Sequence, residues 1–297
     1  MTSSFRPTGQ ATHKTSSYTN ISYDSRSYPL KKTLELTPIE GEMLKPKELI
    51  EVRGVGKFTL QDRRVYNALI ENAWGEDLGK AGVTFEISTG QLRDLCDDNK
   101  RLRDTLRTLQ TTLVEVDSGE RWQSVQLLGY IDLETTANRG ILRYSLQPQL
   151  AALLKDSTIF AKLDHEVMKT FKSKYAFSLY EAVARRVRMK AFMEELTMED
   201  LRNLLGVEEG KLNGYGNLNK YAIQPALLEV NSISDFEVNI VPKKKGKKVT
   251  SFLMGWGIKD EAGKMAAYAE RQRHSAGRKA RATGNTEEVT ANERLTE

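Results

Sequence analysis

Lysines gather at one point of this chain of 297 residues, in the run Pro242-Lys-Lys-Lys-Gly-Lys-Lys248. Alternating apolar residues flank the run over 236–241 and 249–254, and Gly246 can adopt the positive φ that a tight turn needs. The pattern predicts a β-hairpin with five ammonium groups at its tip, on Lys243, Lys244, Lys245, Lys247 and Lys248. Such groups repel each other and gain most when a polyanion neutralises them. A lysine-rich turn can also simply keep a loop soluble or block edge-to-edge association of strands.

An amphipathic helix precedes the hairpin and offers hydrogen-bonding side chains. At about 3.6 residues per turn, one arc of the helix is apolar and consists of Leu218, Ala222, Ala226, Leu227 and Val230. The opposite arc consists of Asn217, Lys220, Tyr221, Gln224 and Leu228. Asn and Gln can pair with the adenine edge, Lys can reach guanine or phosphate, and Tyr can bind phosphate. An ordinary solvated helix has the same pattern, so the neighbouring hairpin is what favours DNA as the ligand.

The order of the elements around this helix predicts a winged helix. Thr197 to Asp200 has the side chains of a helix cap, 201–205 completes a short helix, and Gly206 ends it. A Gly-rich turn, the helix of 218–231 and the lysine hairpin follow. In a winged helix one helix enters the DNA major groove and the hairpin contacts phosphate. A long helix from about 164 to 189 is expected to precede this unit.

The first half of the chain has the same order of elements, although no repeat is visible residue by residue. Helices are expected after caps at Thr59, at Thr89 and at Asp98 or Asn99. Strands are expected at 85–88, 113–117, 125–133 and 141–146, with a turn at Ser118-Gly119 and a further helix opening at Gln147-Pro148. Residues 58–155 therefore form a second helix and hairpin unit.

The helix that follows residue 98 carries basic residues beside its stripe of leucines. These residues are Lys100, Arg101, Arg103 and Arg107. They are typical of a second surface that reads a DNA groove. They are equally typical of a solvated helix on which Asp104 pairs with Arg101 or Arg107.

These patterns together predict an α+β protein with two tandem winged-helix domains and disordered N- and C-terminal tails. Residues 1–57 are expected to be a flexible arm, because the first 30 are rich in Ser, Thr and Tyr and show no sustained period. The two domains are placed at 58–155 and 156–260. Residues 261–297 are rich in Ala, Arg and Glu, which predicts a frayed helix and a tail.

Composition argues against an enzyme. The three histidines, His13, His165 and His274, are far apart, and the single cysteine, Cys96, excludes a disulfide framework and a multi-cysteine metal site. No glycine-rich segment matches a phosphate-binding or dinucleotide-binding loop. We expect no catalytic residues, no metal site and no cofactor. No apolar run is long enough to cross a membrane and no secretory signal is present, which predicts a cytoplasmic protein with a modest net charge of +5.

Four segments resemble the iteron-binding plasmid replication initiators, a family of tandem winged-helix proteins. They are Phe171-Lys-Ser-Lys-Tyr-Ala-Phe-Ser-Leu-Tyr-Glu181, Met198-Glu-Asp-Leu-Arg-Asn-Leu-Leu-Gly206, Leu227-Leu-Glu-Val-Asn231 and Pro242-Lys-Lys-Lys-Gly-Lys-Lys-Val249. The resemblance implies that the second domain reads the major groove of direct repeats at a plasmid origin, through the helix that ends in Glu229-Val-Asn231. The family's basic run at the start of that helix corresponds here to Asn219, Lys220 and Tyr221, of which only Lys220 is charged. Pro225, in mid-helix, should bend the axis.

The resemblance also implies partners. The first domain is expected to contact DNA and to join two chains into a dimer, which represses the initiator's own promoter, whereas monomers start replication at the origin. The candidate dimer surface is the hairpin 113–133. Expected partners are double-stranded plasmid origin DNA, a second copy of the chain, and the replication initiator and replicative helicase of a bacterial host. A winged-helix transcription regulator without origin function is the leading alternative, and a nicking or priming enzyme is a third.

Overall fold

The computed structural model describes residues 31–284, except Glu51, Asp94, Asp97, 118–121 and 135–139. The expected arm over 1–30, the turn at Ser118-Gly119 and the chain beyond 284 lie outside these residues. None of the helices in the described part is both long and apolar enough to cross a bilayer.

The second domain is a three-stranded antiparallel sheet covered by helices. The strand order is β8-β10-β9, so the long β9–β10 hairpin is joined by a strand that the sequence pattern did not reveal. The strands are β8 (Met193–Thr197), β9 (Phe236–Lys245) and β10 (Lys248–Ile258). The helical segments are α7 (Met198–Leu205), α8 (Tyr215–Leu218), the π-helical turn η5 (Asn219–Ile223) and α9 (Gln224–Ile233). The predicted cap of α7 is confirmed: Thr197 and Asp200 form a capping box, and Gly206 ends the helix at φ 66°.

The prediction of a single long helix from 164 to 189 is wrong. The segment instead forms β7 (Phe160–Asp164), α5 (His165–Thr170) and α6 (Lys174–Arg186). Ser173 starts α6, because its hydroxyl accepts hydrogen bonds from the Tyr175 and Ala176 amides. The amides of Lys172 and Ser173 donate to the Glu229 carboxylate at 3.1 and 3.2 Å. A contact 56 residues away along the chain therefore fixes the break between the two helices.

The first domain contains the predicted helices and strands with small shifts. Thr59 and Asp62 form a capping box before α1, Ser88 rather than Thr89 caps α2, and Asp98 caps α3. The helices are α1 (Leu60–Asn72), α2 (Thr89–Leu92), α3 (Asn99–Thr111) and α4 (Pro148–Lys155). The strands are β2 (Phe85–Ser88), β3 (Leu113–Asp117), β4 (Trp122–Gln126), β5 (Ile131–Leu133) and β6 (Ile141–Tyr144). The strand expected over 125–133 is divided, because β4 pairs with β3 whereas β5 pairs with β6.

Residues 31–57, which were expected to belong to a flexible arm, contain regular elements. Short 3-10 turns occupy η1 (Thr33–Glu35), η2 (Lys47–Leu49) and η3 (Val55–Lys57). Strand β1 (Glu42–Pro46) lies between the first two and pairs in antiparallel fashion with β7. Met43 and Leu44 are almost completely buried. Burial of these apolar side chains and the ladder to β7 order a segment whose own composition is unremarkable.

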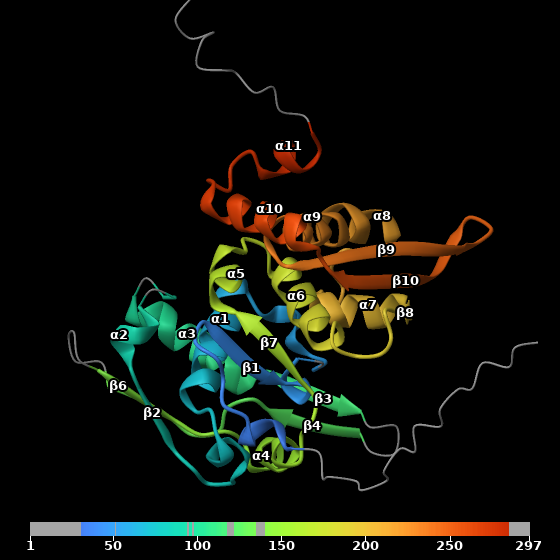
Figure 1. Cartoon of the computed structure of the whole chain (residues 1–297). Coiled ribbons are helices and arrows are strands. Elements are labelled where there is room, and N and C mark those ends of the chain that lie inside the picture. The colour runs from blue at the N-terminus through green and yellow to red at the C-terminus, as the bar shows by residue number, and fades with distance from the viewer. Residues whose placement is uncertain are drawn as a thin grey trace, which may run out of the picture. The chain divides into compact units, whose positions relative to one another are not determined.

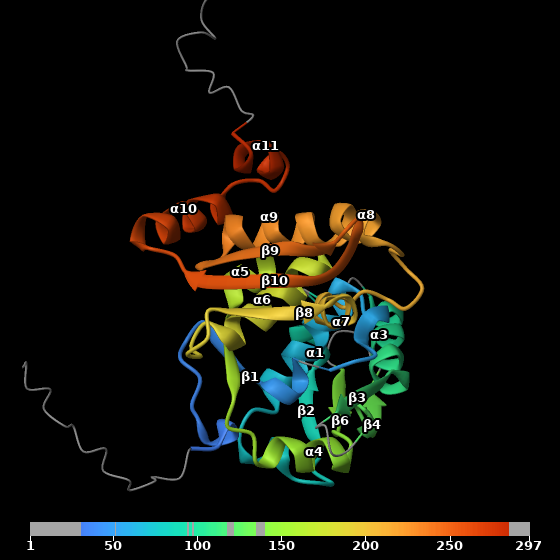
Figure 2. The same cartoon turned by 90° about the vertical axis from the view of Figure 1, so that its right-hand side faces the viewer.

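Helix α6 lies between the β1–β7 ribbon and the β9–β10 hairpin, and it contacts α1, α7 and α9 (Figures 1 and 2). On its face toward β1, the Glu181 carboxylate accepts hydrogen bonds from Lys45 Nζ at 2.7 Å and from Asn67 Nδ2 at 2.9 Å. Lys45 also donates to Asn67 Oδ1 at 2.8 Å. Burial lowers the pKa of the Lys45 ammonium, and the Glu181 charge opposes that shift. Helix α6 thus carries one member of a buried charged cluster that lies beside the apolar core.

Glycines allow close approach where the turn at 54–57 meets the end of α7. A Cβ on Gly56 would lie 2.7 Å from Glu208 Cα, and one on Gly206 would overlap the Arg63 guanidinium. Lys174 Nζ, at the start of α6, donates to the Gly56 carbonyl of the same turn at 2.7 Å. A side chain at position 56 would force the 54–57 turn away from residues 207–208, whereas one at position 206 would displace the Arg63 guanidinium.

The stretch from 261, expected to be a frayed helix and tail, contains two ordered helices in its described part. Helices α10 (Glu261–Gln272) and α11 (Arg278–Ala282) both contact α9. Ala267 is buried there, and Glu270 holds α11 through ion pairs to Arg278 at 3.2 Å and Arg281 at 2.7 Å. Small alanines and these pairs provide order that a scarcity of large apolar residues did not indicate.

Candidate nucleic-acid interface

Helix α8, turn η5 and helix α9 run on as one helix over 215–233, here called the 215–233 helix. The predicted apolar arc is confirmed, since Leu218, Ala222, Ala226, Leu227 and Val230 are all buried. On the other arc Asn217, Lys220, Tyr221 and Gln224 are exposed, and Asn219 is half-buried. The polar side chains are therefore available to a ligand from solvent, while their contact with DNA stays a prediction.

Pro225 changes the helix in a way that the sequence did not specify. Proline has no N–H to donate to the carbonyl four residues earlier. The turn immediately before Pro225 adopts the π register, in which the backbone N–H of Gln224 donates to the backbone carbonyl of Asn219, five residues earlier. Such turns widen a helix by one residue and shift the direction of the side chains on either side.

The side chains of this turn contact one another. Gln224 Nε2 donates to Asn219 Oδ1 at 3.3 Å. The Lys220 ammonium lies 5.0 Å from the centre of the Tyr221 ring, a cation–π distance. Asn217 Nδ2 donates to the Asn213 carbonyl at 3.2 Å. The exposed arc is therefore a set of ordered polar groups.

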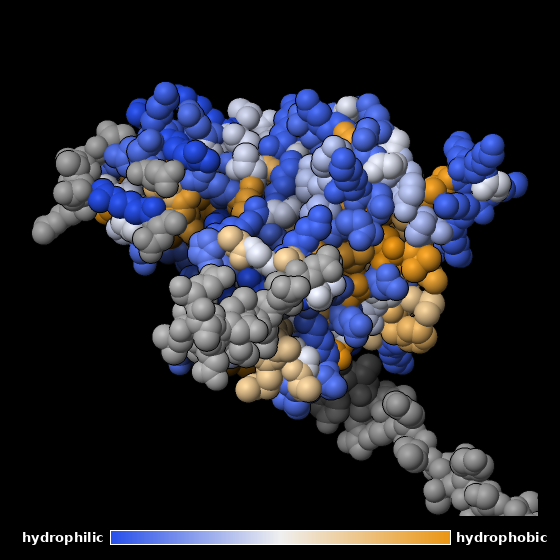
Figure 3. All heavy atoms as spheres, turned by 90° about the horizontal axis from the view of Figure 1, so that it is seen from above, coloured by the Kyte–Doolittle hydropathy of each residue, from blue (hydrophilic) through white to orange (hydrophobic). Residues whose placement is uncertain are grey.

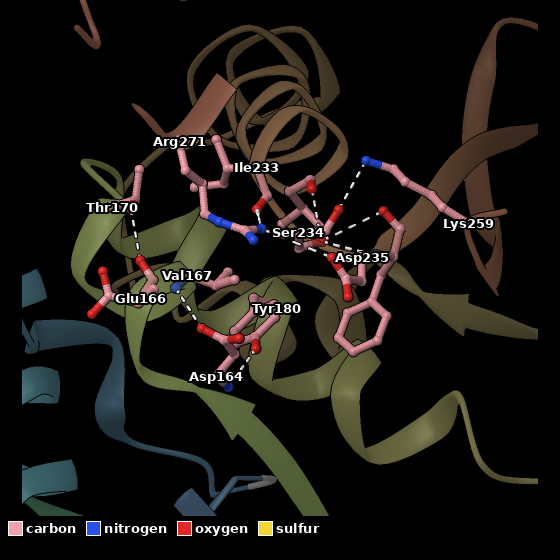
Figure 4. Close-up of polar contacts among 12 residues, drawn as sticks. Asp164, Glu166, Val167, Thr170, Tyr180, Ile233, Ser234, Asp235, Lys259 and Arg271 are labelled. Atoms are coloured by element: carbon pink, nitrogen blue, oxygen red, sulfur yellow. Dashed lines mark hydrogen bonds and ion pairs between the residues drawn. The ribbon is translucent and has the colours of Figure 1, made fainter. Parts of the chain in front are cut away.

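The C-terminal end of the 215–233 helix is held by two cations (Figure 4). Lys259 Nζ donates to the carbonyls of Asn231 and Ser234, and Arg271 Nη1 donates to the Ile233 carbonyl at 2.7 Å. Positive charge also interacts favourably with the negative, C-terminal end of the helix dipole. Half-burial lowers the pKa of the Lys259 ammonium, while Asp235 raises it.

The Glu229-Val-Asn231 motif supports the fold and does not lie on the exposed arc. Glu229 caps the start of α6, as described above. Asn231 Nδ2 donates to the Val238 carbonyl at 2.9 Å, and the Val238 amide donates to Asn231 Oδ1 at 2.8 Å. This pair of bonds fixes the 215–233 helix against β9.

The lysine hairpin has the predicted tip. Lys245 pairs with Lys248, which leaves a two-residue turn with Gly246 at φ 64° in the first position, as a type II′ turn requires. All five lysines are exposed, and the tip projects from the body of the molecule in the view from above (Figure 3).

One of the five lysines differs from the others. Lys243 Nζ forms an ion pair with Glu195 of β8, whose carboxylate also accepts a hydrogen bond from the Ser251 hydroxyl. The hydrogen bond from Lys243, followed by that from Ser251, lowers the pKa of Glu195. Within the described residues the other four tip lysines have no acidic partner. Sequence reasoning missed Glu195, because the strand that carries it was not predicted.

Helix α3 of the first domain presents the second basic surface. Its leucine stripe, Leu102, Leu106 and Leu109, is buried. Lys100, Arg101, Arg103 and Arg107 are exposed. Arg107 pairs with Asp104 at 3.6 Å, as one alternative expected, and Arg101 Nε donates to Gln61 Oε1. Figure 2 shows α3 and α8 on the same side of the protein.

No group of three or more metal-binding side chains occurs in the part of the chain that the structure describes. A cavity of about 790 Å³ in this part of the chain is an open groove between the 52–57 segment and residues 199–213, lined by both cations and carboxylates. That groove does not include the 215–233 helix or the hairpin tip.

Comparison with known proteins agrees with this architecture. The model of "Initiator Replication protein, WH1" matches residues 42–184, and that of "Initiator Rep protein, WH2" matches residues 197–256. The crystal structure of the Pi initiator protein in complex with iteron DNA is similar in fold, with TM-score 0.52 and 16% identity. The similarity covers 76% of this chain and 100% of that one. A search of curated proteins finds no match.

The fold and the two basic surfaces define a protein with two tandem winged-helix domains. The first match begins at residue 42, at the start of β1, and so includes the strand that was expected to belong to the arm. The chain belongs to the family of initiator replication proteins.

Proposed function

We propose that this protein starts plasmid replication by binding directly repeated sequences, iterons, in double-stranded origin DNA. The observation that carries the proposal is the pairing, in one domain, of an exposed polar arc on the 215–233 helix with a hairpin that ends in lysines. The helix would read base edges and the hairpin would contact phosphate. Family membership and the fold shared with an initiator whose structure contains iteron DNA support the same ligand.

The first domain would add contacts to DNA through Lys100, Arg101, Arg103 and Arg107. We infer that it also joins two chains, and that the dimer represses the gene's own promoter. Leu113 on β3 and Trp122 on β4 support this inference, because 57% and 64% of their surfaces are exposed on a short two-stranded ribbon. Host partners would be a chromosomal initiator and a replicative helicase, in the bacterial cytoplasm where plasmid DNA lies.

An origin-cloning experiment tests this function. The gene and its flanking DNA are joined to a selectable marker and introduced into a bacterial host that cannot otherwise maintain the marker. Persistence of the replicon, lost when the gene carries a stop codon, is the expected result. A chain that binds the flanking repeats but supports no replicon would be a winged-helix transcription regulator.

We also propose that the protein is not an enzyme. Purified protein is incubated with supercoiled origin DNA and Mg²⁺, and the topology of the DNA is followed on a gel. The DNA should remain supercoiled. Nicked circles that disappear with a Lys220→Ala variant would instead indicate a nicking activity that depends on the same surface.

A further inference from the structure

Two amides of the 215–233 helix act together although they lie five residues apart. Gln224 Nε2 donates to Asn219 Oδ1 at 3.3 Å. In an α-helix such residues point about 140° away from each other, at about 3.6 residues per turn, and could not bond. The π turn aligns them, and Pro225 favours that turn because it cannot donate in the α register.

In this contact the Gln224 side-chain amide donates and the Asn219 side-chain oxygen accepts. A primary amide has one acceptor oxygen and two N–H donors. With one N–H of Gln224 directed to Asn219, the Oε1 acceptor and the second N–H remain. Among the described residues neither of these atoms has another partner, and the side chain is exposed. Gln224 therefore presents an acceptor and a donor side by side.

That pair of groups complements one base. Adenine offers its N6–H donor and its N7 acceptor in the major groove, and a Gln amide can bind both at once. We propose that Gln224 reads one adenine of the repeat and that Asn219 is the positioning residue that orients its amide. The inference rests on the proposed function, since it requires this helix to enter the major groove.

Selection from a library of random duplexes tests the proposal with the full chain. The wild type should select a motif that contains an adenine at one position, and Gln224→Ala should lose that preference by about 5- to 150-fold. Gln224→Glu should change the preference at the same base pair toward cytosine, because a carboxylate accepts from cytosine N4. Gln272→Ala, an exposed glutamine of α10, is the matched control and should select the wild-type motif.

The positioning role has its own readouts. Asn219→Leu should relax the same base pair as Gln224→Ala, and the double variant should relax it no further. Asn219→Asp keeps the acceptor oxygen, so this variant should keep the preference for adenine at that position. Pro225→Ala permits the α register, so the preference for adenine at this position should weaken.

The outcomes are distinguishable. A wild-type chain that selects no motif overturns the proposed function. If the wild type selects a clear motif but Asn219→Leu and Gln224→Ala weaken the preference at different base pairs, or at none, the proposed function stands. The proposal that Asn219 orients Gln224 toward one adenine is then overturned. Thermal unfolding of each variant, compared with the wild type, distinguishes a loss of base preference from a loss of folded protein.

Discussion

Salt dependence of DNA binding should report how many hairpin lysines reach phosphate. Each phosphate neutralised on duplex DNA contributes about 0.9 to the slope of log affinity against log salt. Lys244, Lys245, Lys247 and Lys248 are exposed and lack acidic partners among the described residues. Replacing all four with alanine should therefore lower the slope by up to about 3.6. The advantage of the wild type over this variant should then shrink about 150-fold between 50 and 200 mM salt.

Lys243 should behave differently, because Glu195 already neutralises it. Lys243→Ala should change the slope by much less than about 0.9, whereas Glu195→Gln should release the lysine and raise the slope toward that value. Lys243 and Ser251 hold the pKa of Glu195 below its usual value, so the carboxylate stays charged at neutral pH. Raising the pH from 6 to 8 should leave the difference between Lys243 and its neighbours unchanged.

Fluorescence anisotropy of a labelled duplex of arbitrary sequence, titrated with the full chain at several KCl concentrations, measures these slopes. Lys155→Ala, an exposed lysine at the end of α4, is the control and should leave the slope as it is. The reasoning is refuted if the fourfold variant keeps the wild-type slope. It is also refuted if Lys243→Ala lowers the slope as much as the average of the other four.

Three further predictions concern reading and stability. Lys220→Ala should lose about 1–3 kcal/mol of discrimination between a selected repeat and its scrambled form, measured by competition binding. Lys45→Met should lower the free energy of unfolding by about 3–5 kcal/mol in urea, because it leaves the Glu181 charge buried and unpaired, and Lys45→Met with Glu181→Leu should lose less. Gly206→Ala should lower the free energy of unfolding by about 1–3 kcal/mol, because Gly206 has a positive φ and an added Cβ would overlap the Arg63 guanidinium. An unchanged midpoint of urea unfolding would contradict this prediction.

Local signals in the sequence were sufficient for most helices and for the hairpin. Thr59 and Thr197 cap helices through side chains three residues away, and strict alternation defines β9 and β10. Elements that depend on distant partners were missed. Strand β1 is ordered by β7, about 118 residues later in its register, and the break before α6 depends on Glu229. No window of local sequence contains both partners of such contacts.

The sequence predicted which arc of the 215–233 helix is buried and which is exposed, but it did not predict the contacts between the exposed side chains. Burial of one arc follows from the spacing of apolar residues, and that arc is buried as expected. A wheel of constant pitch cannot show that Asn219 and Gln224 face each other, because the π turn adds a residue between them. The proline at 225 was the available signal, although bending of the axis was the consequence expected of it.

The cations at the end of the 215–233 helix have a consequence for where this protein can be cut. The second family match stops at residue 256, yet Lys259 and Arg271 lie beyond it and complete the last turn of that helix. A fragment trimmed at the match would leave the carbonyls of Asn231, Ile233 and Ser234 without these donors. The 215–233 helix therefore needs the chain at least through α10 to keep these donors, and the family match alone would place the border of the second domain too early.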